Sequence, residues 1–247
     1  MNDHPCKVVN PTNALASYLA AIEENPDNEK KAAPGGRTKR SIGIRSKFWS
    51  NGRRLNITFI EEQSESFKSL VASIIKQWEP STHLTFTFAE DLPGDIRITT
   101  NTPQNASFIG TDALLIPEHE PTLFLSTAPE HPHFEAATLH EFGHALGLEH
   151  EHQHPKANIP WDEPKVYEYY TTHHQWTAQD IDNNLFSLLP FDDALHGAYD
   201  KDSIMHYPIA NELTVGDWEV GVNTQISKLD RRNMRKAYPK PLPAPES

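Results

Sequence analysis

A short run of histidines and glutamates, HEFGHALGLEHEHQHP at residues 140–155, restricts this chain more than any other feature. On an α-helix, His140 and His144 lie one turn apart on the same face, so both imidazoles can reach one ion at about 2.0–2.1 Å. Glu141, beside the first histidine, can hydrogen-bond a water on that ion without binding the ion itself. The spacing therefore predicts a zinc-binding helix.

Gly147 decides whether a third histidine can join this pair. A straight helix would carry His150 about 9 Å beyond His144, at about 1.5 Å per residue. The chain must therefore leave the helix and turn back, and Gly147 can take the left-handed backbone conformation that such a turn requires. We expect His140, His144 and His150 to bind zinc, and a Gly147→Val change to misplace His150.

Three protein ligands leave a coordination position open, as in catalytic zinc sites. A structural zinc is closed by four ligands that typically include cysteine, and the only cysteine, Cys6, is far upstream in the sequence. A single cysteine also excludes a disulfide within the chain. The opposing interpretation, a surface helix that is merely rich in histidine, must match every motif position by chance. The pattern favours a catalytic site.

Composition divides the 247 residues into an N-terminal segment (1–40), a main domain (41–239) and a proline-rich tail (240–247). In the first of these, residues 12–24 carry a helical apolar stripe, whereas residues 25–40 are polar and basic, as in a linker. The main domain starts with a strand, an amphipathic helix and further strands, and the histidine-rich helix follows. Strands are expected at 54–60, 83–89, 95–100 and 121–126, a helix at 67–78, and later helices after Thr177 and Ser227.

The net charge of −12 is carried by the main domain, which would repel the phosphates of a nucleic acid. No apolar run reaches the roughly 20 residues needed to span a bilayer. The N-terminus lacks the basic and apolar regions of a secretory signal peptide, so we expect a cytoplasmic protein or export by a non-classical route. The expected oligomeric state is a monomer.

HEFGHALGLEH resembles the H-E-x-x-H-x-x-G-x-x-H motif of the metzincin proteases, which also have a methionine turn beneath the zinc. SIMHYP at 203–208 resembles that turn, with Met205 as its methionine. The HEH that runs on from the third ligand and the SIMHY of the turn are similar to the astacins. Weaker similarity covers most of the main domain, through FWSNGRRLNITF, ASFIGTDALL, PTLFLS and KLDRRNMRKAYP.

The resemblance implies an α+β fold with two lobes, in which a mixed twisted sheet and the zinc helix lie above an irregular C-terminal lobe. It implies Zn2+ as the cofactor, Glu141 as the general base and a protein or peptide substrate as the partner. Tyr207 would be an additional zinc ligand in the resting enzyme that swings away to stabilise the transition-state oxyanion; a packed aromatic ring is the alternative. Residues 121–126 are expected to form the edge strand along which an extended substrate binds.

The resemblance also gives Glu151 a role outside the chemistry. In astacins this glutamate pairs with the amino terminus that propeptide removal sets free. The dibasic sequence that ends at Arg40 offers such a cut, which would free Ser41. The alternative is a solvated glutamate, because exposure is the default for this residue type.

The N-terminal segment lacks the aspartate-containing propeptide motif of the astacins. Cys6 offers a different latch, because a thiolate is a strong zinc ligand, although a single cysteine near the N-terminus can also be incidental. The remaining histidines of the cluster, His152 and His154, are expected to be exposed to solvent and without a partner.

Together these features predict a zinc-dependent endopeptidase that hydrolyses peptide bonds with a zinc-bound water activated by Glu141. Two alternatives stay open: a catalytically idle zinc-binding module on a protease fold, and a zinc amidase that acts on non-protein amides. The idle module is the less favoured of the two, because a protein without catalytic activity does not need the Glu141 carboxylate.

Overall fold

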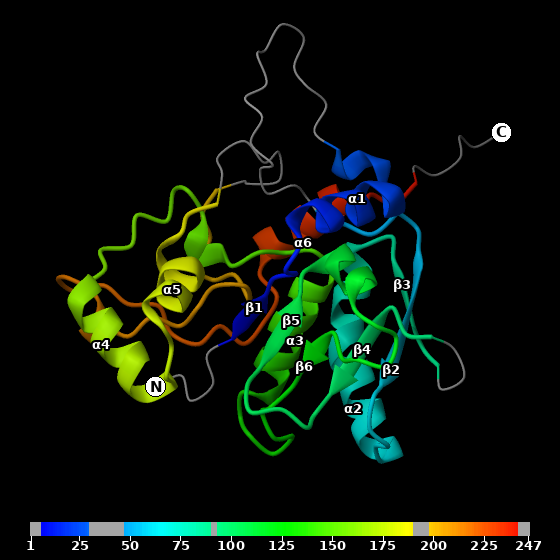
Figure 1. The fold of residues 1–247 in the computed structure, drawn as a ribbon, viewed down its shortest axis with the longest axis horizontal. Helices are drawn as coiled ribbons and strands as arrows, with labels where there is room; N and C mark the ends of the chain where they lie inside the picture. The colour runs from blue at the N-terminus through cyan, green and yellow to red at the C-terminus, as the bar shows by residue number, and fades with distance from the viewer. Residues whose placement is uncertain (1–5, 30–46, 90–92, 190–197, 242–247) are drawn as a thin grey trace, which may run out of the picture.

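A six-stranded mixed sheet occupies one side of the molecule in Figure 1, and a region of short helices and loops lies beside it. The structure is a computed structural model that describes residues 6–29, 47–89, 93–189 and 198–241. The dibasic site at Arg40, the new terminus at Ser41 and most of the proline-rich tail lie outside these residues. The α+β fold with a mixed sheet agrees with the sequence-based prediction.

The sheet has the strand order β1-β5-β6-β4-β2-β3. Strands β2, β3, β4 and β6 run parallel, β5 is antiparallel to β6, and β1 is parallel to β5. The predicted strands at 54–60, 83–89 and 95–100 correspond to β2, β3 and β4. The bounds are β1 (Lys7–Val9), β2 (Arg54–Phe59), β3 (Thr85–Phe88), β4 (Ile96–Thr99), β5 (Ala106–Phe108) and β6 (Leu123–Phe124).

The prediction that residues 121–126 form the edge strand is wrong. Their strand, β6, lies between β5 and β4. The outermost strand of the main domain on this side is β5, and β1 of the N-terminal segment pairs along it, with Lys7 opposite Ala106 and Val9 opposite Phe108. Only three residues form β5, too few to show the alternation by which a strand is recognised in a sequence.

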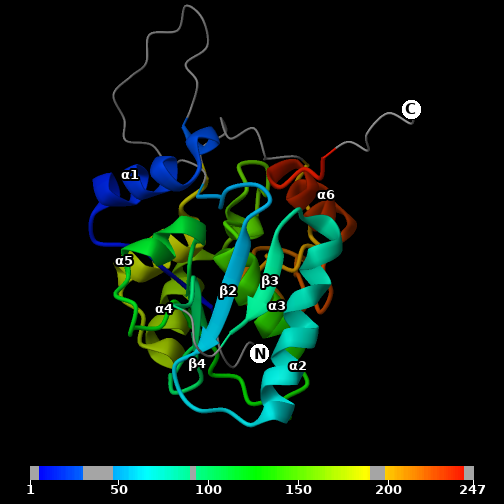
Figure 2. The ribbon, with the colours of Figure 1, turned by 90° about the vertical axis from the view of Figure 1, so that its right-hand side faces the viewer.

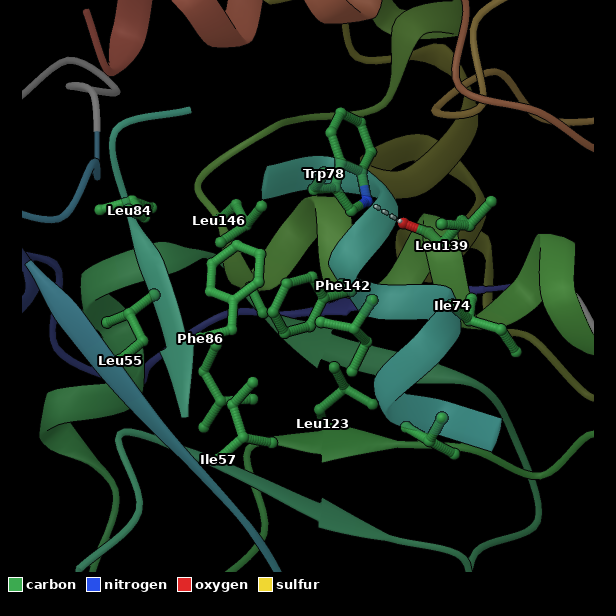
Figure 3. Packing of buried hydrophobic residues seen from close by; sticks show 14 of the residues in the cluster. Leu55, Ile57, Ile74, Trp78, Leu84, Phe86, Leu123, Leu139, Phe142 and Leu146 are labelled. Atoms are coloured by element: carbon green, nitrogen blue, oxygen red, sulfur yellow. Dashed lines mark hydrogen bonds between the residues drawn. The ribbon is translucent and has the colours of Figure 1, made fainter. Parts of the chain in front are cut away.

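Helices α2 (Glu65–Ile75) and α3 (Phe134–Ala145) cover one face of the sheet (Figure 2). The main core fills the space between them, with Leu55 and Ile57 from β2 packed near Phe142 from α3 (Figure 3). The indole of Trp78, just after α2, donates a hydrogen bond to the carbonyl of Leu139 at 3.2 Å. This bond ties the two helices together and fixes the helix that carries the histidines.

Beyond the turn that ends α3, the chain builds a second, smaller core around Val166, Tyr170 and Trp176. Its helices are α4 (Glu163–His174) and α5 (Ala178–Ile181), whereas the last helix, α6 (Lys228–Ala237), adds Met234 to the main core. Both predicted capping boxes form, at the starts of α5 and α6. None of the described helices is long and apolar enough to cross a bilayer.

The N-terminal segment packs onto the main domain through α1 (Ala14–Glu24), which lies against the turn Gly110–Leu115. Residues 25–40 were predicted to be a linker, and for residues 25–29 this prediction is wrong. Asn28 is buried and hydrogen-bonded to the backbone of Phe48. Helix α1 buries Ser17 and Ala21 and leaves its leucines exposed. Residues 6–29 of the segment are therefore part of the folded unit.

Candidate metal and catalytic site

His140 and His144 project from the same side of α3. Their Nε2 atoms are 3.1 Å apart, and Nε2 of His144 is also 3.1 Å from Nε2 of His150. Two ligands of one tetrahedral zinc ion, each at about 2.0–2.1 Å, lie about 3.3 Å apart. The three nitrogen atoms therefore surround one point, as ligands of a single ion do.

Backbone carbonyls fix the proton position on two of these rings. Nδ1 of His140 donates to the carbonyl of Ile204 at 2.7 Å, and Nδ1 of His144 donates to that of Leu148 at 2.8 Å. A carbonyl oxygen can only accept, so the proton lies on Nδ1 and each Nε2 presents a lone pair. Converging lone pairs repel one another unless a cation lies between them, so the arrangement fits a metal ion.

Gly147 ends α3 and turns the chain back, as predicted. Its φ is +99°, its N–H donates to the carbonyl of His144 at 2.8 Å, and the N–H of Leu148 donates to that of Gly143 at 3.0 Å. These are the two bonds of a Schellman motif with glycine at its left-handed position. The turn delivers His150 to the other two rings with its side chain fully buried.

Burial keeps the three imidazoles in the form that binds metal. It lowers the pKa of His140 to about 4, and it lowers the pKa of His144 and His150 well below their usual range. Neutral imidazole is the metal ligand, because a protonated ring has no lone pair to offer. No proton needs to be displaced from these rings at neutral pH.

The turn around Met205 supports this group from below. Ser203 Oγ donates to Asp230 at 2.6 Å, and the N–H of Ile204 donates to the same carboxylate at 2.9 Å. Asp230 belongs to the capping box of α6, so the start of that helix holds the turn. The carbonyl of Ile204 is thereby placed to accept from His140.

Glu141 lies next to the histidines and is only 1% exposed. Burial raises its pKa to about 8. Its Oε2 has no hydrogen-bond partner among the described residues. A carboxyl group with a pKa near neutrality can both accept and release a proton at physiological pH, which is what a general acid–base group must do.

Cys6 reaches the same point from the other end of the chain. One potential ligand atom from each of Cys6, His140, His144 and His150 lies within 4.8 Å of the others. The Cys6 thiol lies beside Glu141, and burial, with the charge of Glu141 adding to the effect, raises the pKa of the thiol. The pairing of β1 with β5 begins at the next residue and fixes the thiol there. The distance along the sequence, which suggested a site with three ligands only, does not reflect the distance in space.

Tyr207 follows the turn and is 1% exposed. Its ring lies 4.8 Å from that of His150 and 4.7 Å from that of His152, centroid to centroid. The hydroxyl has no hydrogen-bond partner in the described part of the chain. Burial raises the pKa of this phenol, and Cys6 adds to the effect. The ring of Tyr207 is packed, and its hydroxyl makes no hydrogen bond to the described residues.

Comparison with known protein families identifies the fold. The sequence profile described as Astacin, a family of peptidases, matches residues 42–239. The chain belongs to the astacin family. Astacins are zinc metallopeptidases, so zinc is the metal of this site and protein is the class of substrate.

Solved structures agree with this astacin assignment. One structure of myroilysin is 36% identical, with a TM-score of 0.74, over 79% of this chain and 97% of that one. A crystal structure of myroilysin is 33% identical, with a TM-score of 0.63, over 95% of this chain and 90% of that one. High choriolytic enzyme 1, a hatching-enzyme zinc-protease of the medaka fish Oryzias latipes, shares the fold at 15% identity and a TM-score of 0.54, over 76% of this chain and 92% of that one. No curated protein sequence matches the chain.

Glu151 of this astacin is not a solvated side chain. Its Oε1 accepts from the N–H of Asp200 at 2.9 Å. Burial raises its pKa to about 8, and the neighbouring charges of Asp230 and Asp200 add to the effect. No basic side chain forms an ion pair with it in the described residues. The carboxylate is placed where a cation would lower its energy.

The prediction that His152 and His154 are exposed is wrong, because they are 1% and 3% exposed. Nε2 of His152 donates to the carbonyl of Asn184 at 2.7 Å, and Nδ1 of His154 accepts from the N–H of Lys156 at 3.0 Å. The turn after the third ligand folds beneath the site, so it carries these side chains inward. A histidine-rich sequence does not show this by itself.

A pocket beside Glu141 was not predicted either. It lies between α3 and the chain after the methionine turn, and Thr127, Ala137, Val222 and Asn223 are part of its wall. Apart from Glu141 and histidines, the wall contains no ionisable side chain other than Cys6 and Tyr207. Thr127, Ala137, Val222 and Asn223 lie outside the zinc motif and the methionine turn, so only the fold brings them to the pocket.

Proposed function

We propose that this astacin is a zinc endopeptidase whose zinc is bound by His140, His144 and His150. The observation that carries the proposal is the convergence of three buried Nε2 lone pairs beside Glu141. When bound, zinc supplies a Lewis acid that polarises the scissile carbonyl and lowers the pKa of water.

In the proposed reaction Glu141 moves the proton. Its carboxylate accepts a proton from the attacking water and passes it to the leaving amine. Burial, which raises the pKa of Glu141, favours its protonated form after it has accepted the proton. Tyr207, whose hydroxyl is unused here, would donate to the oxyanion that develops on the substrate carbonyl.

The substrate would bind as an extended strand along β5. Within the main domain, β5 is the outermost strand on its side of the sheet. The side of β5 that faces away from β6 is paired with β1. Backbone groups that pair with β1 can pair with another extended chain once β1 has left. The pocket beside Glu141, which has no lysine or arginine in its wall, would take an uncharged side chain next to the scissile bond.

The N-terminal segment would hold the enzyme latent. Cys6, which lies within 4.8 Å of the three histidines, would be a fourth ligand, and β1, which pairs with β5, would occupy the substrate strand position. Cleavage after Arg40 would release the segment, and the amino group of Ser41 would then pair with Glu151, which is half-buried without a cation. A monomer is sufficient for each of these steps.

A chelator-controlled cleavage assay tests the proposal. Full-length protein is incubated with casein before and after limited digestion by a protease that cuts behind basic residues. We expect little cleavage before digestion, strong cleavage after it, and loss of cleavage with chelator. Digested protein that binds zinc but cleaves neither casein nor peptides would favour an idle module, and cleavage of non-protein amides alone would favour an amidase.

A further inference from the structure

His150 differs from the other two proposed ligands in its second ring nitrogen. A zinc-binding histidine almost always donates its other N–H to an acceptor, which fixes the ring. His140 and His144 do so through Nδ1, to carbonyl oxygens at 2.7 and 2.8 Å. Nδ1 of His150 is buried and has no partner among the described residues. With Nε2 on the metal, this Nδ1 carries a proton and needs an acceptor.

His152 offers such an acceptor. Its Nε2 donates to the carbonyl of Asn184 at 2.7 Å, so the proton of the neutral ring lies on Nε2 and Nδ1 bears a lone pair. This Nδ1 is also buried without a partner in the described part of the chain. The ring contacts a carbonyl and aromatic rings rather than a carboxylate, which favours the neutral form.

The two rings lie against each other, with centroids 5.0 Å apart and planes tilted by 35°. We propose that His152 is a positioning residue for the zinc site, whose Nδ1 accepts the Nδ1–H of His150 through one bridging water molecule. The inference rests on the proposed ligation of zinc by His150. The donor, Nδ1 of His150, and the acceptor, Nδ1 of His152, are both buried, and neither has a hydrogen-bond partner among the described residues.

The backbone beneath His152 is held firmly enough for this role. Its turn, Glu151–Gln153, is bonded to the π-helical turn Asp182–Phe186 by two consecutive side chains. His152 donates to the carbonyl of Asn184, and Gln153 donates to that of Asn183 at 2.8 Å. The imidazole therefore has a fixed orientation before any metal binds.

Tyr207 is the competing donor, since its ring lies 4.7 Å from that of His152 and its hydroxyl also lacks a described partner. The two possibilities differ in what they affect. The Nδ1–H of His150 needs its acceptor whenever zinc is bound, so its loss weakens zinc binding. A bond that serves Tyr207 alone would change turnover and leave zinc affinity as it is.

Two substitutions separate the nitrogens of His152. Asparagine places an oxygen near the position of Nδ1 but does not reach Asn184, whereas glutamine places a nitrogen near the position of Nε2 and keeps that bond. We measure zinc affinity of the full-length chain by competition with a chelator for wild type, His152→Asn, His152→Gln and His152→Leu. Circular dichroism of each metal-free protein checks that it is folded.

We expect His152→Leu and His152→Gln to bind zinc about 10–100-fold more weakly than wild type, and His152→Asn to stay close to wild type. Retention by His152→Gln with loss in His152→Asn would overturn the inference and assign the residue to holding the turn. Unchanged affinity in all three, even with reduced turnover, would also overturn it.

His154→Leu is the matched control, because His154 is equally buried two residues further on but its ring faces that of Tyr199. Its zinc affinity should equal that of wild type; an equal loss would show that any buried imidazole here supports zinc and would overturn the specific role. If the wild-type chain does not bind zinc, the proposed zinc site is wrong. If wild type binds zinc but the His152 variants bind it equally well, only this inference is wrong.

Discussion

The thiol of Cys6 lies beside the carboxyl group of Glu141 in the wall of one pocket, so the N-terminal segment reaches the group proposed to move the proton. The strand that follows Cys6 lies along β5, where a substrate would bind. The proposed latency would have two components, a thiol at the metal position and a strand along the sheet, and mutation can separate them.

Removing the thiol should weaken latency without abolishing it. In Cys6→Ala the fourth potential ligand is lost while β1 keeps its pairing, so we expect undigested protein to show chelator-sensitive casein cleavage at least about tenfold above wild type. Asn10→Ala, an exposed change in the same segment, is the control. Equal basal rates in Cys6→Ala and wild type would remove Cys6 from the latch.

Replacing the proposed base should separate binding from chemistry. Glu141→Gln keeps the shape of the side chain but cannot accept the proton. After digestion we expect kcat to fall by about 10²–10⁴-fold, the usual contribution of a general acid–base group, while the zinc content measured by atomic absorption stays at the wild-type level. Zinc retained together with full activity would exclude Glu141 as the base.

A side chain at Gly147 should damage the third ligand. A Cβ there would lie 2.8 Å from the ring of Phe48, and φ is +99°. We expect Gly147→Ala to lower the melting temperature and to weaken zinc binding, because the turn that carries His150 must shift. Gly216→Ala is the matched control, since φ is +81° but no atom lies within 4 Å of the new Cβ. That change should cost about 1–3 kcal/mol of backbone strain and leave zinc affinity unaltered.

Acid should remove one contact of the N-terminal segment. Lys7 of β1 pairs with Asp180 at 2.8 Å, and this bond lowers the pKa of Asp180. The stability from a lowered carboxyl pKa is present above the unfolded value of about 3.9 and is lost as the pH falls through the folded value. The pair is partly exposed, so its contribution is at most about 1 kcal/mol.

Urea unfolding of the metal-free chain, wild type against Lys7→Gln, measures this contribution. The difference in the free energy of unfolding should be constant from pH 8 to about pH 4 and should shrink below that. Lys165→Gln, which removes the partner of Asp162 in another surface pair, is the control for a change outside the segment. A difference that grows as the pH falls would contradict the assigned pair.

The end of the segment near Asn28 should matter for stability. Its side chain donates to the carbonyls of Ala21 and Phe48 at 2.9 and 2.8 Å and accepts from the N–H of Phe48 at 3.0 Å. Asn28→Ala leaves these buried groups unpaired, so we expect a loss of about 1–3 kcal/mol or more, measured as a lower melting temperature of the full-length chain. Asn51→Ala, which removes one exposed bond, should change stability by at most about 0.5 kcal/mol.

The sequence was most informative where local geometry determines the outcome. The spacing of His140 and His144, the need for Gly147 and the capping boxes at Thr177 and Ser227 all concern residues within one or two helical turns, and each was predicted. The strands β2, β3 and β4 were predicted because alternation and β-branched residues mark them.

What the sequence did not show depends on contacts between distant segments. Cys6 lies near His140 because β1 joins the sheet. The three residues of β1 are too few to show the alternation that would predict a strand. His152 is buried because its turn folds onto a later one through Asn184. The predicted edge of the sheet was also wrong, since residues 121–126 form a strand that lies between β5 and β4.

The position of β1 also determines whether the side of the sheet is open to other molecules. An uncovered strand at the side of a sheet can pair with the same strand of a second molecule, and such pairing leads to aggregation. While β1 lies along β5, the backbone groups on this side of the sheet are already paired within the chain. The full-length chain is thus protected from self-association at the surface that we propose for substrate binding.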